Sequence, residues 1–265
     1  MKIYFGKIIA GGIGLLTGGI IGLLLGLLVG HFFDRALENA FGFASPENLQ
    51  RIRESFFETT FLLSGYLGKV DGRVSEQEIA HTEQMFVQMG LDATQRQRAI
   101  DLFRRGAAAD FEPEPVVADF LSSSGRQRQL QQALLVFLIS LALADGTLEP
   151  AEHSALVRIA GLMGIGAMQL EALLNMARAG EQFHGTGPRA ASPDAHLADA
   201  YGVLGVDATV SDRDLKRAYR KLMSENHPDK LIAKGVPEDM IKLATERVQD
   251  IQGAYETVRR HRGLK

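Results

Sequence analysis

Three residues near the C-terminal end of the sequence could act together on a partner protein: His227, Pro228 and Asp229. The proline cannot continue a helix and disfavours helical geometry in the residue before it, so the tripeptide predicts a break between two helices. At the exposed tip of a helical hairpin, the imidazole and the carboxylate would face a partner and not the core. The tripeptide alone occurs by chance in many sequences, so its interpretation depends on the segments on either side.

Four acidic residues form a second candidate site, for a cation. They occupy matching positions in an internal repeat whose two copies, 70–91 and 144–165, are offset by 74 residues. Hard divalent cations take oxygen ligands of this kind, although the spacing is not that of an EF-hand loop. The candidate ligands are Asp71, Glu78, Asp145 and Glu152.

Turns and helix caps explain the same repeat without a metal. Gly72 and Gly146 can end a helix in the left-handed conformation. Ser75 with Glu78 is the pattern of a capping box, and Pro150 suits a first helical position. Each copy would then be a helix, a tight turn and a second helix, and both interpretations stay open.

Glycines at every fourth position form a third candidate site, a helix–helix contact: Gly14, Gly18, Gly22, Gly26 and Gly30. Small residues at this spacing let two membrane helices approach closely. Each step of four residues advances by about 400°, so the row drifts by only about 40° per step around a helix. The pattern predicts a homodimer, with chance clustering in a glycine-rich segment as the alternative.

The segment that carries these glycines is long and apolar. Residues 8–29 contain no charge, and as a helix they would run roughly 33 Å, enough for a hydrocarbon core of about 30 Å. A cleavable signal peptide would have a shorter apolar core and a small-residue cleavage site. A buried soluble helix would not tolerate seven glycines, each costing about 1 kcal/mol relative to alanine. We therefore expect a transmembrane helix at 8–30, whose flanking charges leave its orientation undetermined.

The tripeptide lies between two segments with helical periodicity. A short helix at 199–206 should close at Gly205, and a second should run from Ser211 to about Asn226. Apolar residues then recur at spacings of three and four over 241–258, which predicts a long helix that packs antiparallel to the second one. The apolar stripe of the second helix is Leu215, Ala218 and Leu222, and its remaining face carries Arg213, Lys216, Arg217, Arg220 and Lys221.

The combination of a basic helix, a His-Pro-Asp loop and a long following helix resembles the J domain of DnaJ proteins, over residues 197–265. The resemblance implies a DnaK-type chaperone as partner, whose ATPase domain and linker such loops engage. It also implies a set of chaperone-binding residues: His227, Pro228, Asp229, Lys216, Tyr219, Arg220 and Lys221. The sequence has no Gly/Phe-rich region and no cysteine-rich module, so substrate handling of that kind is not expected.

The central residues 49–179 predict a helical domain, and their repeated Asp-Gly-x-aliphatic-x-x-x-Glu pattern resembles the TerB-like domain of tellurite-resistance proteins. That family is proposed to bind metal through such acidic residues. Residues 180–196 are rich in Gly, Pro, Ser and Ala without an apolar period, which indicates a flexible linker. Residues 1–7 and 31–48 flank the membrane segment, and the expected fold class is all-α.

Composition excludes several classes of function. The net charge is −3 and no long region is strongly basic, so we expect no nucleic-acid partner. There is no cysteine, which excludes disulfides and thiolate zinc sites. No nucleophile–base arrangement or phosphate-binding loop is evident, so we expect neither an enzyme nor a cofactor beyond the candidate divalent cation.

The whole layout resembles a family of DnaJ-like membrane co-chaperones with an N-terminal anchor, a TerB-like centre and a C-terminal J domain. The resemblance implies a single-pass protein of the bacterial inner membrane, with a periplasmic N-terminus and the bulk of the chain in the cytoplasm. It also implies a link to envelope-stress or capsule signalling. The rival interpretation is a membrane metal or stress sensor, whose central domain binds a cation and whose J domain recruits chaperone.

Overall fold

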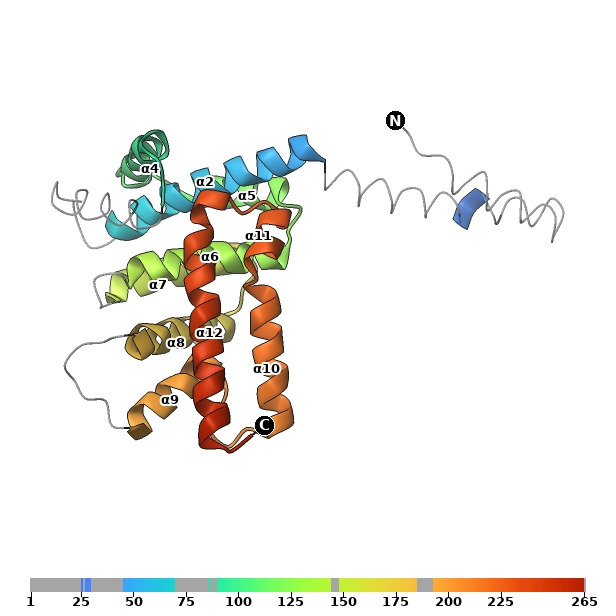
Figure 1. Ribbon diagram of the computed structural model, residues 1–265. Coiled ribbons are helices and arrows are strands. Elements are labelled where there is room, and N and C mark those ends of the chain that lie inside the picture. Colours follow the sequence, from blue (N-terminus) through green and yellow to red (C-terminus); the bar gives the residue numbers. More distant parts are fainter. Residues whose placement is uncertain are drawn as a thin grey trace. The chain divides into compact units, whose positions relative to one another are not determined.

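The computed structural model describes residues 25, 27–29, 45–69, 86, 90–143, 148–184 and 193–264 (Figure 1). Every regular element among these residues is helical, which confirms the predicted all-α class. The chain divides into two units, Met1–Arg51 and Ile52–Lys265, of which the second contains nearly all of the described helices.

The predicted transmembrane segment lies almost entirely outside these residues. Among the described ranges, no helix has the length and apolar character needed to cross a membrane. The five glycines of the predicted dimer contact also lie outside the described residues, so that interpretation stays a prediction.

Six helices among the described residues build the central part of the chain around a core rich in phenylalanine and leucine. The rings of Phe61 and Phe86 meet edge to face with centroids 4.7 Å apart, and Phe56 meets Phe120 at 6.0 Å. All four side chains are at most 1% exposed, so they form the centre of the domain. The helices are α2 (Pro46–Lys69), α4 (Ala93–Gly106), α5 (Pro113–Ser123), α6 (Arg128–Ala142), α7 (Pro150–Leu162) and α8 (Ala167–His184).

Helices α2 and α4 cross at backbone contact. A Cβ added to Gly65 would lie 1.9 Å from the carbonyl oxygen of Phe103, and one added to Gly106 would lie 1.9 Å from that of Leu62. No side chain can occupy either position without separating the helices. Both residues are buried, so the crossing lies inside the domain.

The two copies of the sequence repeat contain the same glycine turn at matching positions. Gly90 and Gly164 both adopt a left-handed backbone, with φ of 92° and 73°. The amide of the next residue then reaches back five positions, 3.3 Å from Leu91 N to Phe86 O and 2.8 Å from Ile165 N to Ala160 O. This is the Schellman pattern, which favours glycine. The predicted turn glycines, Gly72 and Gly146, lie outside the described residues.

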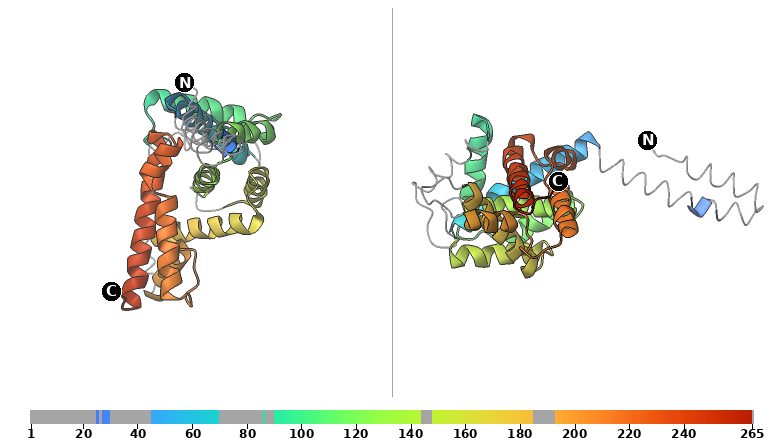
Figure 2. Two further views of the ribbon diagram at one scale, coloured as in Figure 1. Left: turned by 90° about the vertical axis from the view of Figure 1, so that its right-hand side faces the viewer. Right: turned by 60° about the horizontal axis from the view of Figure 1, so that its bottom comes forward.

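The C-terminal helices form a second core. They are α9 (Pro193–Val203), α10 (Asp212–Glu225), α11 (Pro228–Lys234), the short 3-10 helix η1 (Glu238–Met240) and α12 (Ile241–His261). Helices α10 and α12 lie side by side as a hairpin in both directions of view, as predicted (Figure 2). Leu215, Ile251 and Val258 are fully buried between them and α9. The predicted linker 180–196 is helical at both ends, since α8 ends at His184 and α9 begins at Pro193.

Arg262 closes the end of this hairpin that lies away from α11. Its guanidinium donates to the Tyr201 hydroxyl at 2.7 Å, to the carbonyl oxygens of Val210 and Ala208 at 2.7 and 2.8 Å, and to the Asp212 carboxylate at 2.8 Å. The hydrogen bonds that Arg262 donates to Asp212 and Tyr201 raise the pKa of its guanidinium. One side chain thus joins the end of α12 to α9, to the loop after α9 and to the start of α10.

Candidate functional site

Local sequence explains where α10 begins and ends. The Ser211 hydroxyl accepts a hydrogen bond from the Asp214 amide at 3.2 Å, which is the predicted helix start. Asp212 and Asp214 place negative charge in the first turn, where the helix dipole favours it. At the other end, Asn226 caps the helix and its side-chain amide donates to Leu222 O at 2.8 Å.

The His-Pro-Asp loop follows at once. His227 is extended, with φ −62° and ψ 122°, as expected for the residue before a proline. Its Nδ1 accepts a hydrogen bond from the Asp229 amide at 3.2 Å, so His227 is the N-cap of α11 and Pro228 is its first residue. Accepting this bond requires the tautomer with the proton on Nε2. The imidazole and the Asp229 carboxylate are both exposed, and Nε2 remains available to donate to a partner.

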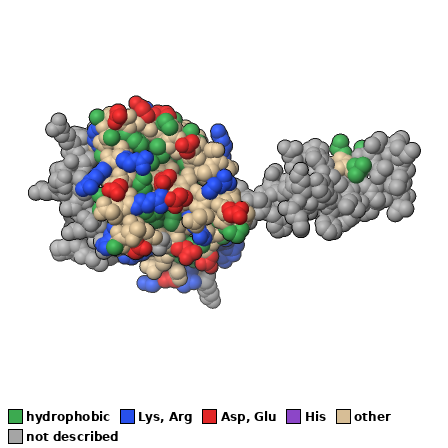
Figure 3. Space-filling view, turned by 90° about the horizontal axis from the view of Figure 1, so that it is seen from above, with side chains coloured by type: hydrophobic (Ala, Val, Ile, Leu, Met, Phe, Trp, Pro, Cys, Tyr) green, Lys and Arg blue, Asp and Glu red, His purple; other side chains and the backbone are tan. Residues whose placement is uncertain are grey.

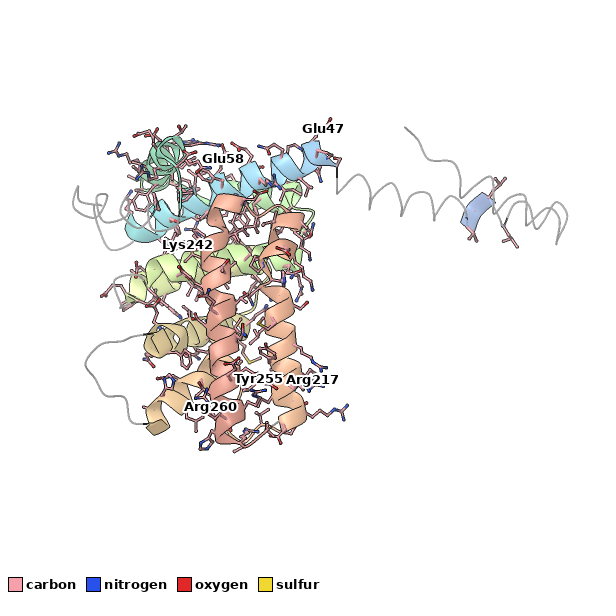
Figure 4. The ribbon with its side chains drawn as sticks, viewed as in Figure 1. Glu47, Glu58, Arg217, Lys242, Tyr255 and Arg260 are labelled. Atoms are coloured by element: carbon pink, nitrogen blue, oxygen red, sulfur yellow. The ribbon has the colours of Figure 1, made fainter. Side chains whose placement is uncertain are left out.

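Basic side chains cover the outer face of α10. Lys216, Arg217, Arg220 and Lys221 are all exposed, opposite the buried stripe headed by Leu215. Arg217 lies on the side of α10 away from α12 (Figure 4). It pairs with Asp214 at 3.0 Å, and Lys221 lies 3.9 Å from Glu225. Lys216 and Arg220 make no such ion pair among the described residues, so their charge is directed outwards.

Tyr219 differs from the other residues of the predicted site. Its ring stacks on Tyr255 of α12, with centroids 4.0 Å apart and planes 12° from parallel. Tyr219 is half-buried, and Tyr255 lies on the side of α12 that faces α10 (Figure 4). Tyr219 therefore contributes to helix packing, and its part in chaperone binding stays a prediction.

The candidate cation site is described at one position only. Asp71, Glu78 and Asp145 lie outside the described residues, and among those described no group of three possible ligands is present. Glu152 accepts a hydrogen bond from the Glu149 amide at 3.0 Å, and Pro150 is the first residue of α7. Glu152 thus has the capping role, while the cation site stays a prediction.

The remaining surface carries no dominant charge on the face that Figure 3 shows, where basic and acidic side chains are interspersed. The outer face of α10 is different, because cationic side chains there lie next to an exposed His-Pro-Asp loop. A helical hairpin with such a loop and such a face is the arrangement expected of a J domain.

Known proteins match this chain over nearly its whole length. Residues 199–262 match the DnaJ domain, residues 58–175 match the family described as tellurite resistance protein TerB, and residues 1–40 match the co-chaperone DjlA transmembrane domain. The co-chaperone protein DjlA of Vibrio cholerae is 39% identical over 98% of this chain and 99% of its own length. Its counterpart in Salmonella typhimurium is 40% identical over 99% of both chains. No solved structure matches.

The chain belongs to the DjlA family of co-chaperones. Its order of transmembrane, TerB-like and J domains is the predicted one, and membrane association with a chaperone as partner follows from it. J-domain co-chaperones are in general not catalytic themselves.

Sequence reasoning missed two polar residues next to the loop. Gln129 of α6 donates to the carbonyl oxygen of Glu225 at 3.1 Å and accepts from Lys234 of α11. Neither residue belongs to a motif, and Gln129 and Lys234 are 105 positions apart in the chain. No pattern in the sequence indicates such a contact.

Proposed function

We propose that this chain stimulates ATP hydrolysis by a DnaK-type chaperone, through the His-Pro-Asp loop and the basic face of α10. The observation that carries the proposal is the arrangement of the loop. His227 and Asp229 are exposed at the break between α10 and α11, while Lys216 and Arg220 extend cationic surface from it. Charged groups on such a face steer an acidic partner and fix its orientation.

The test separates the role of His227 in binding from its role as a helix cap. Asparagine is a good N-cap because its side-chain oxygen accepts the same backbone bond, whereas glutamine is a poor one. We expect both His227→Asn and His227→Gln, in the full chain, to lose stimulation of a purified DnaK-type chaperone in a steady-state ATPase assay. His227→Asn should keep the wild-type melting temperature. Wild-type stimulation by the Asn variant would refute the assignment, and Glu256→Gln on the exposed side of α12 is the control.

The membrane orientation follows from the partner. A DnaK-type chaperone needs ATP, which lies on the cytoplasmic side of a bacterial inner membrane, so the C-terminus belongs there and the N-terminus in the periplasm. Reporter fusions after Lys265 test this, and periplasmic reporter activity would contradict it. A role in envelope-stress or capsule signalling stays a prediction from the family resemblance.

The transmembrane segment supports a homodimer through its glycine row. Dimerisation would place two J domains at one membrane site and raise their local concentration. Replacing Gly18, Gly22 and Gly26 with leucine keeps the segment apolar, so insertion should persist while an in-membrane association reporter loses its signal. An unchanged signal would mean that the glycines are not the interface.

A further inference from the structure

The J domain shares its core with the last helix of the central domain. Ala179 of α8 is 8% exposed and belongs to the same buried cluster as Ala200, Leu204 and Ile251. Helices α8 and α9 lie so close that a Cβ on Gly202 would be 2.7 Å from the Ala179 Cβ. The J domain is therefore not a separate body that swings on a linker, because α8 forms one wall of it.

A half-buried arginine strengthens this junction. Arg247 of α12 donates from Nη1 to the carbonyl oxygen of Met176 in α8 at 3.2 Å. Its burial lowers the pKa of the guanidinium, and the neighbouring Asp250 opposes that effect. A half-buried guanidinium that is bonded to α8 helps to hold α12 on that helix.

Far from this junction, α6 reaches the base of the His-Pro-Asp loop. The Gln129 amide uses its donor on the Glu225 carbonyl, 3.1 Å away, and its acceptor on the Lys234 ammonium. Glu225 is the last residue of α10 and Lys234 is the last residue of α11. One amide thus connects the helix before the loop to the helix after it.

The contact leaves the loop accessible. His227 and Asp229 are exposed although Gln129 is half-buried against the flanking helices. A second tie lies nearby, where Arg53 of α2 is 3.7 Å from Glu238 of η1. Covering the loop would inhibit the J domain, whereas bonding its two ends reduces the conformations that a partner must select.

We propose that Gln129 is a positioning residue: the central domain, through this amide, holds the His-Pro-Asp loop in the conformation that engages the chaperone. The proposal rests on the proposed function of the loop. It assigns to the TerB-like domain a part in the chaperone reaction that is independent of any cation. Gln129 acts through Glu225 and Lys234 and does not itself contact the chaperone.

The first test measures the ATPase rate of a purified bacterial DnaK-type chaperone against the concentration of the full chain in detergent. A net hydrogen bond contributes about 0.5–1.5 kcal/mol, so we expect Gln129→Ala to raise the half-saturating concentration about two- to tenfold. The maximal stimulated rate should be unchanged, because the loop residues themselves are intact. Gln97→Ala is the matched control, since Gln97 is exposed on α4 and, among the described residues, its side chain bonds to Asp101 of its own helix. An unchanged half-saturating concentration would overturn the proposal.

The second test needs no chaperone. Amide hydrogen exchange over residues 226–236 should be faster in Gln129→Ala, while α12 exchanges as in the wild type. Lys234→Met should by itself increase exchange over the same residues. The double variant should exchange little faster than either single variant, because both substitutions break the same connection between α6 and the helices that flank the loop. Unchanged exchange over 226–236 would show that Gln129 does not hold the loop. If the wild-type chain fails to stimulate the ATPase, the proposed function is wrong, and the exchange measurement still decides whether Gln129 holds the loop.

Discussion

Among single substitutions of partly exposed residues in the J domain, Arg262→Ala should be the most destabilising. The guanidinium is 16% exposed and makes four hydrogen bonds to four different residues. It also lies 5.2 Å from the centroid of the Tyr201 ring, within cation–π range. Truncation leaves the carbonyl oxygens of Ala208 and Val210 without this donor.

The expected loss of stability can be estimated from the groups that Arg262 contacts. The Asp212 carboxylate is 58% exposed, so its ion pair contributes only about 0.5 kcal/mol. The two carbonyl bonds and the bond to the Tyr201 hydroxyl contribute about 1 kcal/mol each, with some loss because water can reach the truncated site. We therefore expect Arg262→Ala to lower the free energy of unfolding by about 2–4 kcal/mol.

Three further variants divide that total into its parts. Asp212→Asn should cost less than about 1 kcal/mol, and Tyr201→Phe about 1 kcal/mol. Arg262→Lys keeps the charge but loses the planar fork of donors, so it should recover less than half of the loss. Urea denaturation of the full chain in detergent, followed by circular dichroism, measures each change. The reasoning is refuted if Arg262→Ala lies within about 0.5 kcal/mol of the wild type.

Three other outcomes are expected. Reversing the charges of Lys216 and Arg220 should slow association with the chaperone about tenfold at low salt, and the effect should shrink as salt rises. Reversing the charges of two arginines in the last turn of α12 is the matched control and should change the association rate little. A loss of association rate that does not depend on salt would instead indicate misfolding. Gly65→Ala should cost about 3 kcal/mol or more, since its Cβ would overlap the backbone of α4, and a melting temperature equal to the wild type would contradict that crossing. A fragment 190–265 should be about 2 kcal/mol less stable than 167–265, which retains the α8 side chains of the shared core; equal stability in urea would contradict their contribution.

The hairpin was predictable because each of its signals is local. Ser211 and Asp214 are three residues apart and cap α10, as the sequence indicated. The apolar residues of 241–258 recur at helical spacing, and α12 buries Ile251 and Val258 accordingly. Local bonds and periodicity are properties of a single element, so they can be recognised before the partner elements are known.

Helix α11 was missed although its signals were present. Pro228 was interpreted only as the end of one helix, yet proline also suits the first turn of the next. Gly235, with φ of 107°, ends α11 in the left-handed conformation. A helix of seven residues is too short to show an apolar period, so only its two end signals could have indicated it.

The predicted linker at 180–196 shows which part of a domain's packing composition does not indicate. Glycine, proline and serine between 185 and 192 indicate a break in secondary structure, and α8 does end before this segment while α9 begins after it. The hydrophobic core continues across this interruption of the helices, however, because Ala179 packs with α9 and α12. Gln129 then adds a contact across about a hundred positions, from the central domain to the two ends of the loop. Core packing at α8 positions the α10–α12 hairpin, and the Gln129 amide of α6 positions the His-Pro-Asp loop. A substitution inside the TerB-like helices can therefore change the conformation of His227.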